Sequence, residues 1–115
     1  MSAKLPAIIR KRILVVDDER EDADLLARML MDMGYATESV LSGRKAIAHL
    51  KDGFDLILLD VTMPYPDGLE VAREVRRNPS CHDVPIIMMT ALATQPVRLR
   101  AVEAGASDLA RAAPS

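Results

Sequence analysis

The chain has 115 residues, half of them apolar, and a formal net charge of −2. This length suits one domain with a single core, and we expect residues 1–115 to form it, with the core over 11–109 and an extension over 1–10. The small net charge argues against a direct nucleic-acid partner or a membrane partner. The single cysteine, Cys81, cannot form an internal disulfide, which favours a cytoplasmic protein.

Short apolar runs alternate with helical patterns in the first half of the chain. Residues 12–18 are apolar and β-branched before they turn acidic. Apolar residues over 20–33 then recur at the spacing of one helix face, and Gly34 ends the pattern. Residues 35–40 alternate like a strand, and a second amphipathic stretch runs on to Gly53. The first half therefore predicts two strand–helix units.

The second half repeats this alternation. Residues 54–61 and 84–90 are apolar without alternating, which is typical of parallel strands buried on both faces. Between them the pattern predicts a helix over 68–77, and Asp67 and Glu70 have the spacing of an N-cap and its reciprocal partner. These segments add a third strand–helix unit and a fourth strand.

A fourth helix is predicted to open at Thr94 and Pro96 and to close at Gly105. Four strand–helix units imply an α/β fold, a doubly wound parallel sheet with helices on both faces. The segment that follows, "SDLARAA" over 107–113, has a plausible N-cap in Ser107, good helix formers and no β-branched residue. We therefore expect the end of the chain to be frayed or helical.

Three of the apolar runs end in side chains that carry oxygen: Asp17 and Asp18 after the first, Asp60 after the third, and Thr90 after the fourth. Ligands of such sheets bind beyond the carboxyl ends of the strands. Adjacent strands would bring the three carboxylates close together, which is costly unless a cation neutralises them. Mg²⁺ is the cation that this set of oxygen ligands favours.

Each of these residues also has an ordinary structural explanation. Asp18 could cap the first helix, with Glu21 as its partner three residues later. Asp60 could face solvent at a strand end, and Thr90 could be a turn hydroxyl. Their joint appearance at the ends of several strands favours a site.

The segments "ILVVDDE", "LILLDVTMPYPDGLE", "PIIMMTA" and "GASD", in this order and spacing, resemble a response-regulator receiver domain of two-component signalling, a CheY-like domain. The resemblance covers about residues 11–109. It implies a flavodoxin-like sheet of five parallel strands in the order 2-1-3-4-5. It also implies that a phosphoryl group passes from a kinase phosphohistidine to an aspartate.

The resemblance assigns roles by position. Asp60 would accept the phosphoryl group. Asp18, Asp60 and the backbone carbonyl of Thr62 would hold Mg²⁺ directly, with Asp17 acting through a water molecule. Thr90 would hydrogen-bond the phosphoryl oxygens and reorient on phosphorylation. The chemistry agrees, because a carboxylate nucleophile attacking phosphorus needs its negative charge offset.

The C-terminal end departs from the family pattern. Ala112 stands where the family has a lysine, and Arg111 beside it could reach the site only through a one-residue slip. Leu109 stands where the family has an aromatic switch residue. The family also continues into a fifth helix, without which we expect an exposed apolar patch. A second copy, another partner or further residues would cover that patch.

We therefore expect a cytoplasmic receiver in a phosphorelay. Its partners would be a histidine kinase or histidine phosphotransfer protein and a downstream protein, with a homodimer as one form. It would catalyse nothing beyond its own Mg²⁺-dependent phosphorylation. The alternative is a degenerate receiver that acts as an interaction module without phosphorylation. A third class, a phosphohydrolase with an aspartyl-phosphate, usually has a second acid two residues after the nucleophile, where this chain has Thr62.

Overall fold

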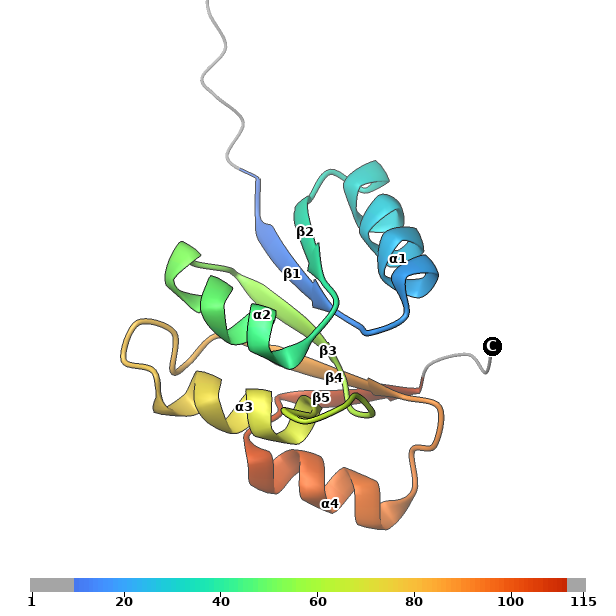
Figure 1. Ribbon diagram of the computed structural model, residues 1–115, viewed down its shortest axis with the longest axis vertical. Coiled ribbons are helices and arrows are strands. Elements are labelled where there is room, and N and C mark those ends of the chain that lie inside the picture. Colours follow the sequence, from blue (N-terminus) through green and yellow to red (C-terminus); the bar gives the residue numbers. More distant parts are fainter. Residues whose placement is uncertain (1–9, 112–115) are drawn as a thin grey trace, which may run out of the picture.

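The computed structural model describes residues 10–111, which form one parallel sheet of five strands in the order β2-β1-β3-β4-β5 (Figure 1). The strands are β1 (Arg12–Val16), β2 (Ala36–Val40), β3 (Leu56–Asp60), β4 (Ile86–Thr90) and β5 (Asp108–Arg111). The helices are α1 (Arg20–Asp32), α2 (Gly43–His49), α3 (Gly68–Arg77) and α4 (Gln95–Ala104), and a 3₁₀ turn, η1 (Leu50–Asp52), extends α2. The predicted fold class and strand order are confirmed.

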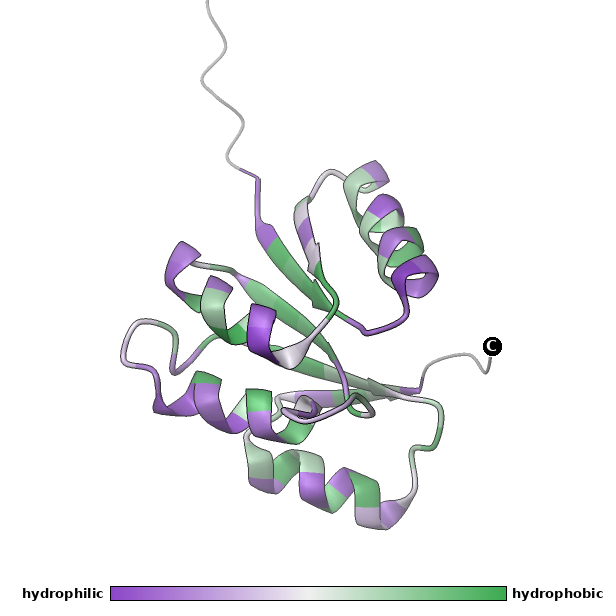
Figure 2. Cartoon of the chain, in the orientation of Figure 1, coloured by the Kyte–Doolittle hydropathy of each residue, from purple (hydrophilic) through white to green (hydrophobic). Residues whose placement is uncertain are grey.

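The helices cover the two faces of the sheet unequally. In Figure 1, α1 lies on one face, and α2, α3 and α4 lie together on the other. The larger core packs beneath those three helices and includes Leu14, Leu59 and Met88, and the smaller core packs beneath α1 around Val15 and Leu58. The strands accordingly hold the most hydrophobic part of the ribbon in Figure 2. Burial on both faces explains why β1 and β3 are apolar without alternating.

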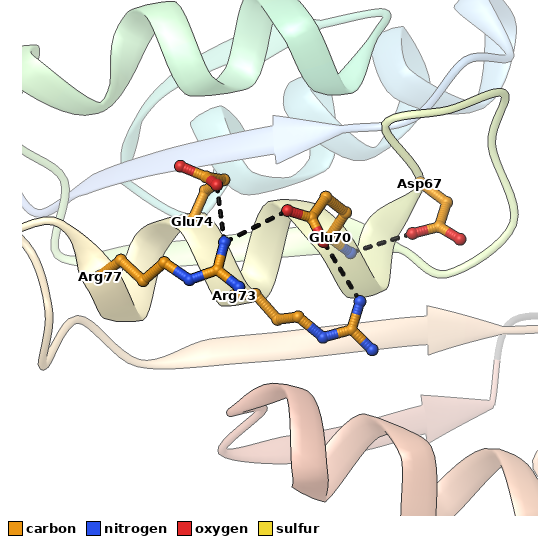
Figure 3. Close-up of polar contacts among 5 residues, drawn as sticks. All are labelled: Asp67, Glu70, Arg73, Glu74 and Arg77. Atoms are coloured by element: carbon orange, nitrogen blue, oxygen red, sulfur yellow. Dashed lines mark hydrogen bonds and ion pairs between the residues drawn. The ribbon is translucent and has the colours of Figure 1, made fainter.

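The ends of α1 and α4 and the start of α3 lie where the sequence predicted them. Gly34 and Gly105 follow α1 and α4 with φ angles of +102° and +106°, a backbone region that favours glycine. At the start of α3, Asp67 Oδ1 accepts a hydrogen bond from the Glu70 amide at 2.9 Å. The expected reciprocal bond is not formed. The Glu70 carboxylate instead pairs with Arg73 and Arg77, each at 3.3 Å (Figure 3).

The expectation that the end of the chain would be frayed or helical is wrong for Asp108–Arg111, which forms β5. Strand β4 offers an open edge, and pairing with it outweighs the helix propensity of these residues. Ser107, expected as a helix cap, instead starts the pairing. Its amide donates to the Ile86 carbonyl at 2.8 Å, and its hydroxyl oxygen accepts from the Ile86 amide at 3.1 Å. The register then places Arg111 opposite Thr90, and Ala112 lies outside the described residues.

Arg76, on α3, ties this end of the fold together. Its guanidinium donates to the carbonyls of Gly105 at 2.9 Å, His82 at 3.0 Å and Val84 at 2.6 Å, and to the Ser107 hydroxyl at 3.4 Å. These acceptors belong to the end of α4 and to the segments leading into β4 and β5. One side chain therefore connects three parts of the chain.

The α1 side of the sheet is less completely covered than the other. Ile87 and Met89 of β4 face this side and are only partly buried. Along α1 and its C-cap, Leu25, Met29 and Met33 recur every four residues and are 61%, 53% and 70% exposed. They form one apolar stripe, which agrees with the expectation of an exposed apolar patch. Among residues 10–111, no helix is long and apolar enough to cross a membrane.

Candidate functional site: an acidic edge of the sheet

The predicted acidic residues meet at the carboxyl ends of β1 and β3. These strands are neighbours, with Val16 opposite Leu59, so the residues that follow Val16 lie beside Asp60. One carboxylate oxygen from each of Asp17, Asp18 and Asp60 lies within 4.8 Å of the others. The structure therefore brings together the three carboxylates that the sequence suggested.

The environment raises the pKa of two of these groups. Burial is the main cause for Asp60, followed by the nearby charges of Asp17 and Asp18, and its pKa rises to about 6. Burial likewise raises the pKa of Asp17 above its ordinary value, with smaller contributions from the charges of Asp22 and Asp18. A cation among the three groups would oppose both effects.

Asp18 does not cap α1, so that alternative is wrong. The N-cap residue is Glu19, and no side chain caps the helix. The Glu19 amide donates instead to Asp17 Oδ1 at 3.0 Å, which fixes the turn that leaves β1. No hydrogen bond or ion pair among residues 10–111 engages the Asp18 carboxylate, so it is available to a ligand.

Two glycines hold the loop over 61–67 against the site. A Cβ on Gly68 would collide with the backbone carbonyl of Asp60, and one on Gly43 would collide with the carbonyl of Pro66. Within the loop, the Thr62 amide donates to Asp60 Oδ1 at 3.0 Å and orients that carboxylate. The Asp67 cap then fixes the start of α3 (Figure 3). The loop is thus packed closely between α2 and α3.

The Thr90 hydroxyl is engaged within its own loop. Thr90 is buried at the end of β4, and its Oγ1 accepts a hydrogen bond from the Leu92 amide at 3.1 Å. This agrees with the reading of Thr90 as a turn hydroxyl in this conformation. In the sheet, Met89 pairs with Asp60, so Thr90 lies one residue beyond the partner of Asp60. A ligand on Asp60 would therefore lie beside a residue whose hydroxyl bonds the following loop.

Two residues of the departing segment, Leu109 and Arg111, lie on β5. Leu109 is partly buried and packs against the larger core, beneath the helices on that face. Arg111 is exposed and pairs with Thr90 in regular register, so the described strand contains no slip that would bring Arg111 into the position of Ala112.

The sequence reasoning missed a second cluster. Glu38, His49 and Asp52 each offer one ligand atom within 4.8 Å of the others. They come from β2, α2 and η1, and no linear motif connects the strand residue to the other two. The three-residue spacing of His49 and Asp52 was the only local signal. This spacing alone does not indicate a metal site, because the third residue, Glu38, lies on a different element.

A doubly wound parallel sheet whose first and third strands end in converging carboxylates defines an α/β protein of the flavodoxin-like type with an acidic edge. The donor set consists of hard oxygen ligands, two of them with a raised pKa, and this fits a divalent cation such as Mg²⁺.

Comparison with known proteins identifies the family. The model of the response regulator receiver domain matches residues 13–110, so the chain belongs to this family. Its fold resembles the chemotaxis protein CheY4 of Vibrio cholerae with a TM-score of 0.88 and 28% identity, over 93% of this chain and 90% of that one. Receiver domains are signalling domains of two-component systems and generally not enzymes.

Curated relatives are longer than this chain. It is 43% identical over 98 residues to the transcriptional regulatory protein ResD of Bacillus subtilis, covering 84% of this chain and 40% of ResD. It is 39% identical over 98 residues to the response regulator PleD of Caulobacter vibrioides, covering 84% of this chain and 22% of PleD. The chain therefore corresponds to the receiver portion of such proteins.

Proposed function

We propose that this receiver accepts a phosphoryl group on Asp60 in a phosphorelay and signals through altered protein–protein contacts. The observation that carries the proposal is the convergence of Asp17, Asp18 and Asp60 at one edge of the sheet. Its donor would be a histidine kinase or a histidine phosphotransfer protein, and its place of action the cytoplasm. A downstream protein partner, or a second copy of this chain, would read the phosphorylated state.

In the proposed transfer, a carboxylate oxygen of Asp60 forms a bond to phosphorus while the phosphorus–nitrogen bond of the donor breaks. The bonding electrons leave with the donor imidazole. Asp17, Asp18 and Asp60, with the Thr62 carbonyl, would hold Mg²⁺, which offsets the charges of the carboxylates and the transferring group. The Thr62 amide already fixes Asp60 Oδ1, so the other oxygen is the one free to attack.

After transfer, Thr90 would supply the response. Its hydroxyl would turn from the Leu92 backbone toward the phosphoryl oxygens, which accept hydrogen bonds strongly. The loop that follows β4 would then lose its present anchor. A local electrostatic change would in this way alter the surface near α4.

The test is incubation with a small acyl phosphate and Mg²⁺, followed by intact-mass analysis and site mapping. We expect one added phosphoryl group that requires Mg²⁺ and is absent in Asp60→Asn. The matched control is Asp24→Asn, which removes an exposed aspartate of α1 and should leave the addition unchanged. A well-folded protein that gains no phosphoryl group beside a competent control receiver would contradict the proposal.

The alternative is a degenerate receiver that binds partners without phosphorylation. Leu109 favours it, because an aliphatic side chain packed against the core lacks the ring of the family's aromatic switch. The two functions differ in what Asp60→Asn does. Unchanged partner binding and oligomeric state in that variant, with or without the acyl phosphate, would favour the alternative.

A further inference from the structure

The second side-chain cluster lies apart from the acidic edge. Glu38 is on β2, His49 is near the end of α2, and Asp52 is on η1. One ligand atom from each lies within 4.8 Å of the others. Zinc bonds of about 2.0–2.2 Å would place two tetrahedral ligand atoms roughly 3.4 Å apart. Small rotations of the exposed Glu38 and Asp52 side chains would shorten the distances between the ligand atoms from at most 4.8 Å to this value.

The imidazole of His49 is already oriented for a ligand. Its Nδ1 lies 2.8 Å from the Lys45 carbonyl oxygen, which can only accept, so Nδ1 carries the hydrogen. Nε2 is then the nitrogen with a free lone pair. A metal-binding histidine commonly holds its other ring nitrogen on a backbone carbonyl in this way, which fixes the tautomer and the ring.

In the described part of the chain, the carboxylates of the cluster are not neutralised by an ion pair, although the Arg12 guanidinium lies close by. The three ion pairs found among residues 10–111 all lie on α3, so neither Glu38 nor Asp52 takes part in one. The nearby Arg12 guanidinium donates to the backbone carbonyls of Asp52 and Gly53, not to the carboxylates. The carboxyl end of α2, where His49 lies, adds a negative potential of its own.

We propose that Glu38, His49 and Asp52 form a binding site for a divalent transition metal such as Zn²⁺. Imidazole is a ligand for zinc and its neighbours, whereas a site of oxygen ligands alone suits Mg²⁺. The ligands come from β2, α2 and η1, so a bound ion would join the edge strand of the sheet to the end of a helix. The chain thus carries two cation sites that differ in ligand chemistry.

The experiment titrates ZnCl₂ into the full chain by calorimetry in saturating MgCl₂, in the Asp60→Asn background to weaken competition at the acidic edge. We expect one Zn²⁺ per chain. Side-chain NMR should show a zinc-dependent shift at Nε2 of His49 and none at His82, the other histidine of the chain. His82 is the matched comparison because its Nδ1 also lies near a backbone carbonyl, that of Pro79 at 3.3 Å.

Variants then assign the ligands. His49→Gln should weaken zinc binding about tenfold or more, and Glu38→Gln and Asp52→Asn should each weaken it by a similar factor. His82→Gln should change it by less than about twofold. Metal-free melting temperatures equal to that of the parent would show that the variants remain folded. Zinc affinity unchanged in both His49→Gln and Glu38→Gln, or a zinc-dependent shift at His82 instead of His49, would overturn the proposal.

Discussion

The carboxyl group of Asp60 links the charge of the site to the stability of the fold. Burial and the neighbouring aspartates raise its pKa from 3.8 to about 6, so folding favours the protonated form. This stabilisation is fully present at a pH below 3.8, the pKa of Asp60 in the unfolded chain. It is lost as the pH rises through about 6, the pKa of Asp60 in the folded protein. Between pH 4 and pH 7 the unfolding free energy of the Mg²⁺-free protein should fall, by on the order of 1 kcal/mol after allowance for solvent screening.

Denaturant unfolding of the parent and of Asp60→Asn across this pH range measures the effect. The variant lacks the titrating group, so it should lose most of the decline and be the more stable protein at neutral pH. Added Mg²⁺ should narrow the gap, because the ion binds the ionised carboxylates of the folded parent. Parallel pH profiles for the two proteins would contradict the assignment to Asp60.

Gly68 packs directly against the backbone of Asp60, the central residue of the site. A side chain there would push the start of α3 away from the Asp60 carbonyl. Gly68→Ala should therefore cost about 1–3 kcal/mol of stability and also weaken Mg²⁺ binding several-fold. Unfolding titrations and Mg²⁺ binding measure the two effects.

The control for this variant is Gly34→Ala. It strains a positive φ angle after α1 but meets no atom within 4 Å. It should lower stability and leave Mg²⁺ affinity unchanged. A Gly68→Ala protein with normal Mg²⁺ affinity would show that this contact does not position Asp60.

Residue-level prediction succeeded where strand ends alone determine position. Asp17, Asp18 and Asp60 could be brought together because parallel strands end at one edge of a sheet. For Thr90 the sequence left open whether its hydroxyl bonds a turn or faces the site, since this depends on the path of the next loop. The cluster around His49 also escaped prediction because it depends on where α2 crosses β2. The roles of Asp60, Thr90 and Thr62 in phosphoryl transfer remain predictions.

At the scale of elements, Arg76 holds the entry to β5. Its bonds reach three backbone carbonyls and the Ser107 hydroxyl, so Arg76→Ala leaves the partly buried carbonyls of Gly105 and Val84 without their guanidinium donor. We expect a loss of about 2 kcal/mol. Hydrogen exchange should show faster exchange in β5 than in β1.

The matched control is Arg73→Ala on the same helix. Arg73 makes one exposed ion pair with Glu70, so its removal should cost at most about 0.5 kcal/mol and leave β5 protected. Equal losses in the two variants, or unchanged exchange of β5 in Arg76→Ala, would show that Arg76 does not anchor this strand.

Elements whose patterning agreed with their tertiary role were predicted well. Strand β3 is central and apolar on both faces, and Gly34 and Gly105 end helices as their sequence positions suggested. The resemblance implied a fifth strand, but the local sequence pattern did not predict β5, because its four residues are poor strand formers. Its conformation comes from the open edge of β4 and from Ser107. The strand conformation of these residues depends on pairing with β4, and the residues themselves carry no local signal for it.

At the scale of the molecule, we expect the apolar stripe of Leu25, Met29 and Met33 to make the α1 side prone to self-association. We expect the mean mass measured by light scattering to rise with protein concentration. Met29→Glu should suppress that rise. Met31→Glu is the control, because Met31 is equally exposed (51%) but lies on a different side of α1. A mass of one chain at every concentration would contradict this expectation.

The loop over 61–67 cannot accept inserted residues, because Gly43 and Gly68 pack closely against it on either side. Surface loops ordinarily accept insertions. This one has a helix pressed on each flank with no room for even a methyl group. A single added residue would displace either Asp60 or the start of α3.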